Sequence, residues 1–200
     1  MRFGNFCKMI EQLEAIDHHL VLAINAMHST FLDSFMWFLS GSYILFFLLP
    51  FVSYFLLKAY NSKQLTWIFI AIILTIILTD QLSVHAFKEV FQRYRPSHNL
   101  LLKPQLHLHE YPDGSLYKGG KFGFVSSHAS NYFGILTIIY TLINQRWVKV
   151  VLFVIALLII YSRVYLGVHF VSDVICGALL GYVLAKFILQ FLLLRKVKVA

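Results

Sequence analysis

The sequence predicts an all-α integral membrane protein, a polytopic bundle of helices that forms one domain over residues 1–200. Hydrophobic residues make up 59% of the chain and charged residues only 13%, whereas about a quarter of the residues in a soluble domain are charged. Apolar runs that approach the thickness of a bilayer recur along the chain. The two cysteines, Cys7 and Cys176, are too few for a disulfide framework or a metal site.

An interfacial helix is expected at the start of the chain, over residues 5–27. Apolar side chains recur there at helical spacing, opposite Glu11, Glu14 and His18, as in a helix that lies along a membrane surface. The alternative is a sixth span over residues 20–38. Polar residues weaken that alternative, namely Asn25, His28, Ser29, Thr30 and Asp33.

Five transmembrane spans are predicted from the apolar runs. The strongest parts of these runs cover residues 43–57, 65–79, 128–143, 148–161 and 170–194. The first run is short for a hydrocarbon core of about 30 Å. We therefore expect this span to begin earlier, near Phe38, and to use tilt or flanking aromatic residues such as Trp37 and Tyr43.

The distribution of cations bears on the orientation in the membrane. Over the last four connections and the C-terminal tail, one side carries Lys58, Lys63, Arg146, Lys149, Arg195, Lys196 and Lys198, and the other carries Lys88, Arg93, Arg95, Lys103, Lys118, Lys121 and Arg163. Each side thus has seven cations, so the positive-inside rule alone does not determine the orientation. If a site holds Lys88, Arg95 and Arg163, four cations remain on the side of the site against seven on the other side. The side of the site then points away from the cytoplasm. The net charge of +8 then reflects anchoring residues and an anion site, and no nucleic acid partner is expected.

Three polar clusters fall at span ends that alternation of the helices brings to one membrane surface. The first holds Lys88, Arg95 and Pro96, the second holds Ser126, Ser127 and His128, and the third holds Ser162, Arg163, His169 and Asp173. An ammonium and two planar guanidinium groups suit the oxygens of a phosphate dianion. A helix start at Ser126 adds hydrogen-bond donors.

The histidines supply a reactive pair of groups. His169 and Asp173 are four residues apart and therefore share one helical face. The carboxylate can accept from Nδ1 of the ring and leave Nε2 as a nucleophile. His128 can protonate a leaving oxygen. Together the clusters provide a nucleophile, an orienting group, an acid and a phosphate clamp, without a metal.

This combined pattern resembles the type 2 phosphatidic acid phosphatase superfamily, which also includes vanadium haloperoxidases and glucose-6-phosphatase. Its first signature is Lys, six residues, Arg-Pro, and its third is Ser-Arg, five residues, His, three residues, Asp. Both match residue for residue. The second, Pro-Ser-Gly-His, reads Val125, Ser126, Ser127, His128 in this chain. The glycine of the family lets its backbone amide approach a phosphate oxygen, and Ser127 stands at that position.

The resemblance implies a phosphohistidine mechanism without a cofactor. If the matching residues have the roles that they have in the family, His169 attacks phosphorus, Asp173 orients His169, and His128 protonates the leaving group. The phosphoryl oxygens are bound by Lys88, Arg95, Ser126, Ser127 and Arg163. Water then hydrolyses the intermediate, with His128 as the base.

The connection over residues 97–123 is long enough to act as a lid above this site. Alternating leucine and histidine before a Pro-Asp-Gly turn predict a small hairpin there. A metal site made of His107, His109 and Glu110 is the weaker interpretation, because that spacing offers no further ligands.

The sequence therefore predicts a metal-independent phosphatase of the bacterial inner membrane whose active site faces the periplasm or the outside. The resemblance implies a lipid phosphate or diphosphate as substrate, such as undecaprenyl diphosphate, phosphatidylglycerophosphate, phosphatidate or the 1-phosphate of lipid A. Membrane lipids are the other expected partners, and the oligomeric state is left open. The alternative is a noncatalytic lipid-phosphate binder or transporter, which has no need of two reactive histidines.

Overall fold

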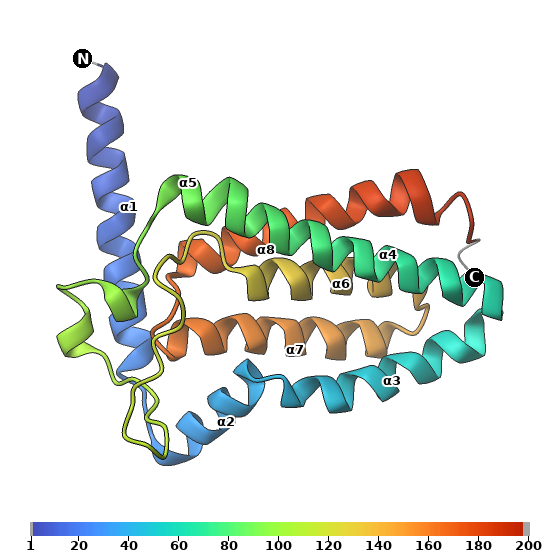
Figure 1. Ribbon diagram of the computed structural model, residues 1–200, viewed down its shortest axis with the longest axis horizontal. Helices are drawn as coiled ribbons and strands as arrows, with labels where there is room; N and C mark the ends of the chain where they lie inside the picture. The colour runs from blue at the N-terminus through green and yellow to red at the C-terminus, as the bar shows by residue number, and fades with distance from the viewer. Residues whose placement is uncertain (1, 198–200) are drawn as a thin grey trace.

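The computed structural model describes residues 2–197, with side chains from residue 8 onward. The described chain is helical apart from its loops and two isolated β-bridges. Its α-helices are α1 (Arg2–Asn25), α2 (Thr30–Ser40), α3 (Tyr43–Ala59), α4 (Ser62–Gln81), α5 (Glu89–Phe91), α6 (Ser127–Leu142), α7 (Arg146–Tyr165) and α8 (Val171–Ile188). Helices α3, α4, α6, α7 and α8 run roughly alongside one another (Figure 1). The all-α fold predicted from the sequence is confirmed.

Helix α4 extends well beyond the apolar run that predicts it. It begins with a capping box, in which Asn61 and Gln64 satisfy each other's backbone amides at 3.0 and 3.1 Å. It continues through a π-helical segment, Leu82–Lys88, into the short α5. This extension carries Lys88 past the apolar part of the helix to the end of the bundle where the loops gather (Figure 1).

Close packing of α6 against α8 brings the second and third polar clusters together. A Cβ atom at Gly177 of α8 would lie only 2.5 Å from the carbonyl oxygen of Ser126 and 3.0 Å from Cβ of Ala129. Small residues allow two membrane helices to approach this closely. The start of α6 therefore lies directly against the start of α8, and the amide of Ser126 donates to the carbonyl of Asp173 at 3.0 Å.

Within residues 2–197, three helical stretches are long and apolar enough to cross a bilayer, namely Ser62–Phe91, Arg146–Tyr165 and Val171–Leu193. The α2–α3 pair makes a fourth candidate if it forms one bent span. Helix α6 has 16 residues, or about 24 Å at 1.5 Å per residue, so the count of five spans stays a prediction. Apolar side chains exposed on the outside of the bundle, such as Phe46, Phe47 and Phe69, suit contact with lipid.

The first span is not one straight helix. The sequence analysis expected it to begin near Phe38, but α2 ends at Ser40, and α3 continues at an angle of 57° to it. The break coincides with Gly41 and Ser42, and the amide of Gly41 closes α2 by bonding to the carbonyl oxygens of Trp37 and Phe38.

Helix α1 lies across the end of the bundle rather than within it (Figure 1). Its exposed apolar side chains include Ile10, Leu13 and Ile16, which matches the amphipathic helix expected over residues 5–27. A continuous sixth span over residues 20–38 is wrong, because α1 ends at Asn25 and a new helix starts at Thr30. Asp17 lies four residues after Leu13, on the same side of α1, and is buried, with 6% exposure.

The connection over residues 97–123 covers the end of the bundle at which the polar clusters lie (Figure 1). The small hairpin predicted from the sequence is present as a single bridge between Glu110 and Leu116. Two hydrogen bonds flank that bridge, from the amide of Tyr111 to Ser115 and from that of Tyr117 to His109, both 2.8 Å long. The lid function of this loop stays a prediction.

Candidate active site

The first candidate feature is a histidine–carboxylate pair at the start of α8. Nδ1 of His169 lies 3.4 Å from Oδ2 of Asp173, and the same oxygen accepts from the amide of Phe170 at 3.0 Å. Both side chains are buried. A carboxylate at Nδ1 favours the tautomer that carries its proton there, which leaves the lone pair of Nε2 available for attack.

The environment of His169 keeps its ring neutral. Burial lowers the pKa of His169 well below its usual value, and nearby Arg95 and Arg163 lower it further. Lys88 and His128 act on the same pKa in the same direction. Groups from all three polar clusters thus come close enough to influence one imidazole ring. A neutral ring at physiological pH is the form that a histidine nucleophile requires.

Two buried arginines face this dyad. Arg95 donates from Nε to the carbonyl of Phe122 at 3.1 Å and from Nη1 to that of Val168 at 3.2 Å. Burial and the neighbouring charge of Arg163 lower the pKa of Arg95 to about 10, so it stays charged at neutral pH. Such neighbouring cations in a buried site favour the binding of an anion between them.

Arg163 has hydrogen-bonding capacity left for a ligand. Its Nη1 donates to Oγ of Ser40, and its Nη2 donates to the hydroxyl of Tyr117 at 2.9 Å. Its Nε is buried and has no hydrogen-bond partner in the part of the chain that the structure describes. A buried donor without a partner is costly, and a phosphate oxygen would satisfy it.

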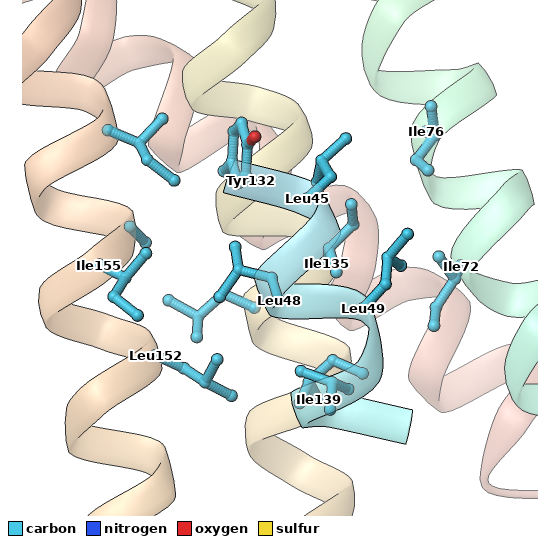
Figure 2. Close-up of a pocket in the computed structure, with 14 residues that line it drawn as sticks. Leu45, Leu48, Leu49, Ile72, Ile76, Tyr132, Ile135, Ile139, Leu152 and Ile155 are labelled. Carbon is cyan, nitrogen blue, oxygen red and sulfur yellow. The ribbon is translucent and has the colours of Figure 1, made fainter. Parts of the chain in front are cut away.

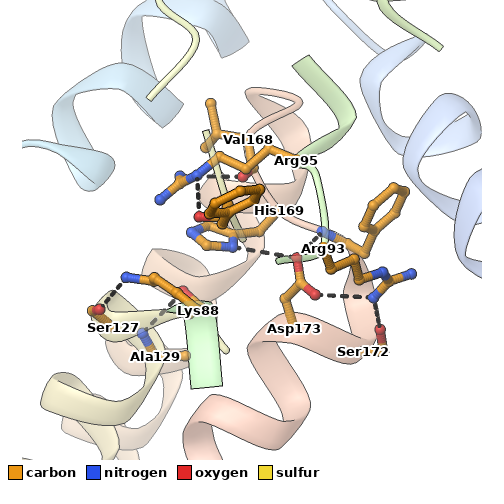
Figure 3. A network of polar contacts seen from close by, with 12 residues as sticks. Lys88, Arg93, Arg95, Ser127, Ala129, Val168, His169, Ser172 and Asp173 are labelled. Carbon is orange, nitrogen blue, oxygen red and sulfur yellow. Dashed lines mark hydrogen bonds and ion pairs between the residues drawn. The ribbon is translucent and has the colours of Figure 1, made fainter. Parts of the chain in front are cut away.

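The remaining cation of the predicted clamp, Lys88, is held by Ser127. Its Nζ donates to Oγ of Ser127 at 2.5 Å (Figure 3). Oγ of Ser83 lies 2.6 Å from the same hydroxyl. Ser126 is the N-cap of α6, and its hydroxyl accepts from the amide of Ala129 at 3.4 Å. The structure therefore gives both serine hydroxyls protein partners, and their binding to phosphate stays a prediction.

We expect the hydroxyl of Ser127 to serve mainly as the hydrogen-bond acceptor of Lys88 when no substrate is bound. If so, Ser127→Ala and Ser127→Gly both free the ammonium group without removing a phosphate ligand. Phosphate release should then stay within about tenfold of the wild type, or roughly 1.4 kcal/mol in barrier height. Steady-state kinetics of both variants test this. A much larger loss in both would show that the hydroxyl itself binds the phosphoryl group.

Three side chains near the dyad were not singled out in the sequence analysis. Arg93 donates from Nη1 to Oδ1 of Asp173 at 2.9 Å and to Oγ of Ser172 at 2.7 Å (Figure 3). From Nη2 it donates to Oδ2 of Asp17 at 2.8 Å. Arg93 sits two residues before Arg95, so a cluster of basic residues could have indicated it. Asp17, on a surface helix far away in sequence, gave no such signal.

Loop glycines let residues 97–123 approach the site closely. A Cβ atom at Gly123 would lie 2.9 Å from Oδ2 of Asp173 and 3.1 Å from Cγ of Arg95. At Gly119, where φ is +64°, it would lie 2.7 Å from Nη1 of Arg95. Together with the bond from Arg163 to Tyr117, these contacts place the loop directly over the cations.

The loop histidines do not form the metal site considered from the sequence. His109 stacks on Trp37 with ring centroids 3.8 Å apart. His107 instead joins His28 and Asp33, whose ligand atoms lie within 4.8 Å of one another. The two imidazole rings are nearly parallel, at 15°, so their lone pairs do not converge on one point. Nε2 of His107 bonds to Asp33 at 3.1 Å, which ties the loop to α2.

An apolar cavity of about 260 Å³ lies between helices α3, α4, α6 and α7 (Figure 2). Leucine and isoleucine side chains make up most of its wall, including Leu48, Ile72 and Leu152. A second depression of about 250 Å³ contains His128 and shares four wall residues with the first, namely Leu45, Ile76, Tyr132 and Ile135. The apolar cavity therefore adjoins the depression that contains His128.

Comparison with known proteins identifies relatives that cover most of the chain. The PAP2 superfamily matches residues 64–196. A lipid A 4'-phosphatase of Bacteroides thetaiotaomicron is 35% identical over 86% of this chain and 75% of its own length. One of Porphyromonas gingivalis is 29% identical over 90% and 74%. The crystal structure of a transmembrane PAP2-type phosphatidylglycerolphosphate phosphatase from Bacillus subtilis superimposes with a TM-score of 0.65 and 26% identity, covering 90% of this chain and 86% of that one.

Proposed function

The chain belongs to the PAP2 superfamily and is a membrane phosphatase, and from this premise we propose that it hydrolyses a phosphate monoester of a lipid through a phosphohistidine intermediate. The observation that carries the proposal is the buried pair of His169 and Asp173, which faces three cations. A noncatalytic binder or transporter would make no use of such a pair.

In the proposed first step, Nε2 of His169 attacks phosphorus, and the bond between phosphorus and the leaving oxygen breaks. His128 gives its proton to that oxygen, so the lipid leaves as an alcohol. Phosphorylation at Nε2 makes the ring cationic with its proton on Nδ1, and the carboxylate of Asp173 at 3.4 Å stabilises that charge. In the second step, water gives a proton to His128 and attacks phosphorus, and the His169–phosphorus bond breaks.

Lys88, Arg95 and Arg163 have the role of phosphate clamp in this mechanism. Negative charge spreads over the transferred phosphoryl group in the transition state, and preorganised donors stabilise it most strongly in a buried site. Arg95 is already fixed by two carbonyl groups. Lys88 can turn from Ser127 toward the substrate, and the unpartnered Nε of Arg163 offers a further donor. Ser127 adds its backbone amide at the start of α6, whereas the amide of Ser126 already donates to the carbonyl of Asp173.

The apolar cavity supports a lipid as the substrate. It adjoins the depression that contains His128, so a hydrocarbon chain could lie between α3 and α4 while its phosphate reaches the cations. Two relatives are lipid A 4'-phosphatases, so we propose the 4'-phosphate of lipid A as the first candidate. The sequence analysis named the 1-phosphate instead. Phosphatidylglycerophosphate is the second candidate, because of the Bacillus subtilis structure.

The proposed location is the inner membrane, with the site on the outward face. The cations outside the clamp favour this orientation, since four remain on the side of the site against seven on the other. Lipid phosphates presented in the outer leaflet would then reach the site from the bilayer.

Purified protein in detergent micelles should release phosphate from lipid A or phosphatidylglycerophosphate with excess chelator present. The proposed clamp consists of cationic side chains, so we expect turnover with and without the chelator to agree within about twofold, since no metal-bound oxygen takes part. Phosphate assays on a panel of lipid phosphates also rank the substrates. Activity that disappears with the chelator and returns with Mg²⁺ or Zn²⁺ would contradict the mechanism, and no turnover on any lipid would contradict the function.

A further inference from the structure

The two oxygens of the Asp173 carboxylate have separate partners. Oδ2 is directed at His169 and accepts from the amide of Phe170, while Oδ1 accepts from Nη1 of Arg93 at 2.9 Å. Figure 3 shows Asp173 between the imidazole on one side and the guanidinium group on the other. Asp173 is 0% exposed, so these protein groups rather than water determine the rotation of the carboxylate.

Arg93 is itself held from its opposite side by the N-terminal helix. Oδ2 of Asp17 accepts from Nη2 of Arg93 at 2.8 Å, and Oδ1 accepts from the amide of Ser172 at 3.0 Å. The hydroxyl of Ser172 bonds to both Asp17 and Arg93. The guanidinium carbon also lies 4.1 Å from the ring centre of Phe170. Among the described residues, the hydrogen-bond partners of the guanidinium group all belong to α1 or the start of α8, and none belongs to the clamp.

The charges make this arrangement necessary. Asp17 and Asp173 are two buried carboxylates that share one guanidinium group. Like charges held close together in a buried place repel each other unless a cation lies between them. Arg93 gives one hydrogen bond to each carboxylate, and its planar guanidinium group fixes these two donors relative to each other, which the single ammonium of a lysine cannot do.

We propose that Arg93, anchored by Asp17, is a positioning residue that keeps Oδ2 of Asp173 directed at Nδ1 of His169. The proposal rests on the proposed role of His169 as the nucleophile. Arg93 does not contact the phosphate in this scheme. It acts through Asp173, so that the carboxylate is ready to stabilise the positive charge that forms on His169. Helix α1, which carries Asp17, thereby helps to fix the geometry of the active site.

Kinetics with an aryl phosphate test the proposal. We expect Arg93→Gln to lower kcat by about 30-fold or more while KM changes less than about threefold, because substrate binding is untouched. Arg93→Lys should have a higher kcat than Arg93→Gln. Asp17→Asn should lower kcat by a smaller factor than Arg93→Gln does. In an Asp173→Asn background, Arg93→Gln should change kcat by less than about twofold, since residues that act through one group are not additive.

The matched control is Arg146→Gln, an exposed arginine at the start of α7 that should leave kcat and thermal stability unchanged. A rise in KM for Arg93→Gln, or a full further loss in the Asp173→Asn background, would make Arg93 a phosphate ligand and overturn the proposal. Loss of kcat in proportion to loss of folded protein on thermal unfolding would make it merely structural.

A readout that needs no turnover separates this inference from the proposed function. In protein labelled with ¹⁵N-histidine, the wild-type His169 should carry its proton on Nδ1, and Arg93→Gln should shift the population toward Nε2. That result supports the positioning role even if no lipid is hydrolysed. An unchanged His169 signal in Arg93→Gln would overturn it, whatever the activity of the wild type.

Discussion

His169→Ala abolishes the phosphoenzyme and lowers turnover by about three orders of magnitude or more, if His169 is the nucleophile. Removing the nucleophile from a set of groups that act together costs nearly the whole contribution of the set. The clamp of Lys88, Arg95 and Arg163 stays in place in this variant, so the substrate should still bind. We therefore expect the fall to appear in kcat rather than in KM.

The measurement is rapid quenching at neutral or alkaline pH after reaction with a ³²P-labelled aryl phosphate. Phosphohistidine is acid-labile, so mapping the labelled peptide after such a quench identifies the residue. His85→Ala is the matched control, because His85 is an exposed histidine on the same extended helix as Lys88. Label that persists in His169→Ala would exclude this residue as the nucleophile, and no label in any variant would favour direct attack by water.

The sequence could predict that the candidate site residues lie close together, because each lies at the end of an apolar run. Apolar runs must cross the bilayer, so their ends meet at two surfaces only, and alternation assigns each end to one of them. The spacing of His169 and Asp173 then places both on one helical face. The structure confirms this nearness, with Nδ1 and Oδ2 at 3.4 Å.

The parts that could not be predicted depend on contacts between segments far apart in the chain. Asp17 meets Arg93 across 76 residues, and a carboxylate on an amphipathic surface helix looks like any solvated group. Tyr117 bonds to Arg163 from a loop whose path over the site depends on Gly119 and Gly123. The break between α2 and α3 was also missed, because one glycine and one serine inside an apolar run give a weak signal.

The hydroxyl of Ser127 shows how a departure from the family pattern acquires a local meaning. The family glycine has no side chain, whereas this serine accepts from Lys88 and lies 2.6 Å from Oγ of Ser83. Both partners come from the extension of α4 beyond its apolar run. The hydroxyl of Ser127 therefore couples the position of Lys88 to the start of α6. From the motif alone, this serine would have been interpreted as a defect.

The second large effect is expected in His128→Ala, which should lower turnover of lipid substrates and of aryl phosphates by different factors. A lipid alkoxide or sugar alkoxide is a poor leaving group, so loss of the general acid should lower lipid turnover by about 10²- to 10⁴-fold. An aryl phosphate leaves as a weakly basic phenolate and needs little protonation. Its first step should be preserved, while the second step still lacks the base that activates water.

The phosphorylated form of His169 should therefore accumulate in His128→Ala when the substrate is an aryl phosphate. A burst of phenol close to one equivalent per enzyme, followed by slow turnover, is the expected time course, and the labelled peptide should contain His169. The same experiment on His85→Ala should give the wild-type time course. Equal losses on lipid and aryl substrates without a burst would show that His128 binds the phosphoryl group instead, since a general acid must discriminate between leaving groups.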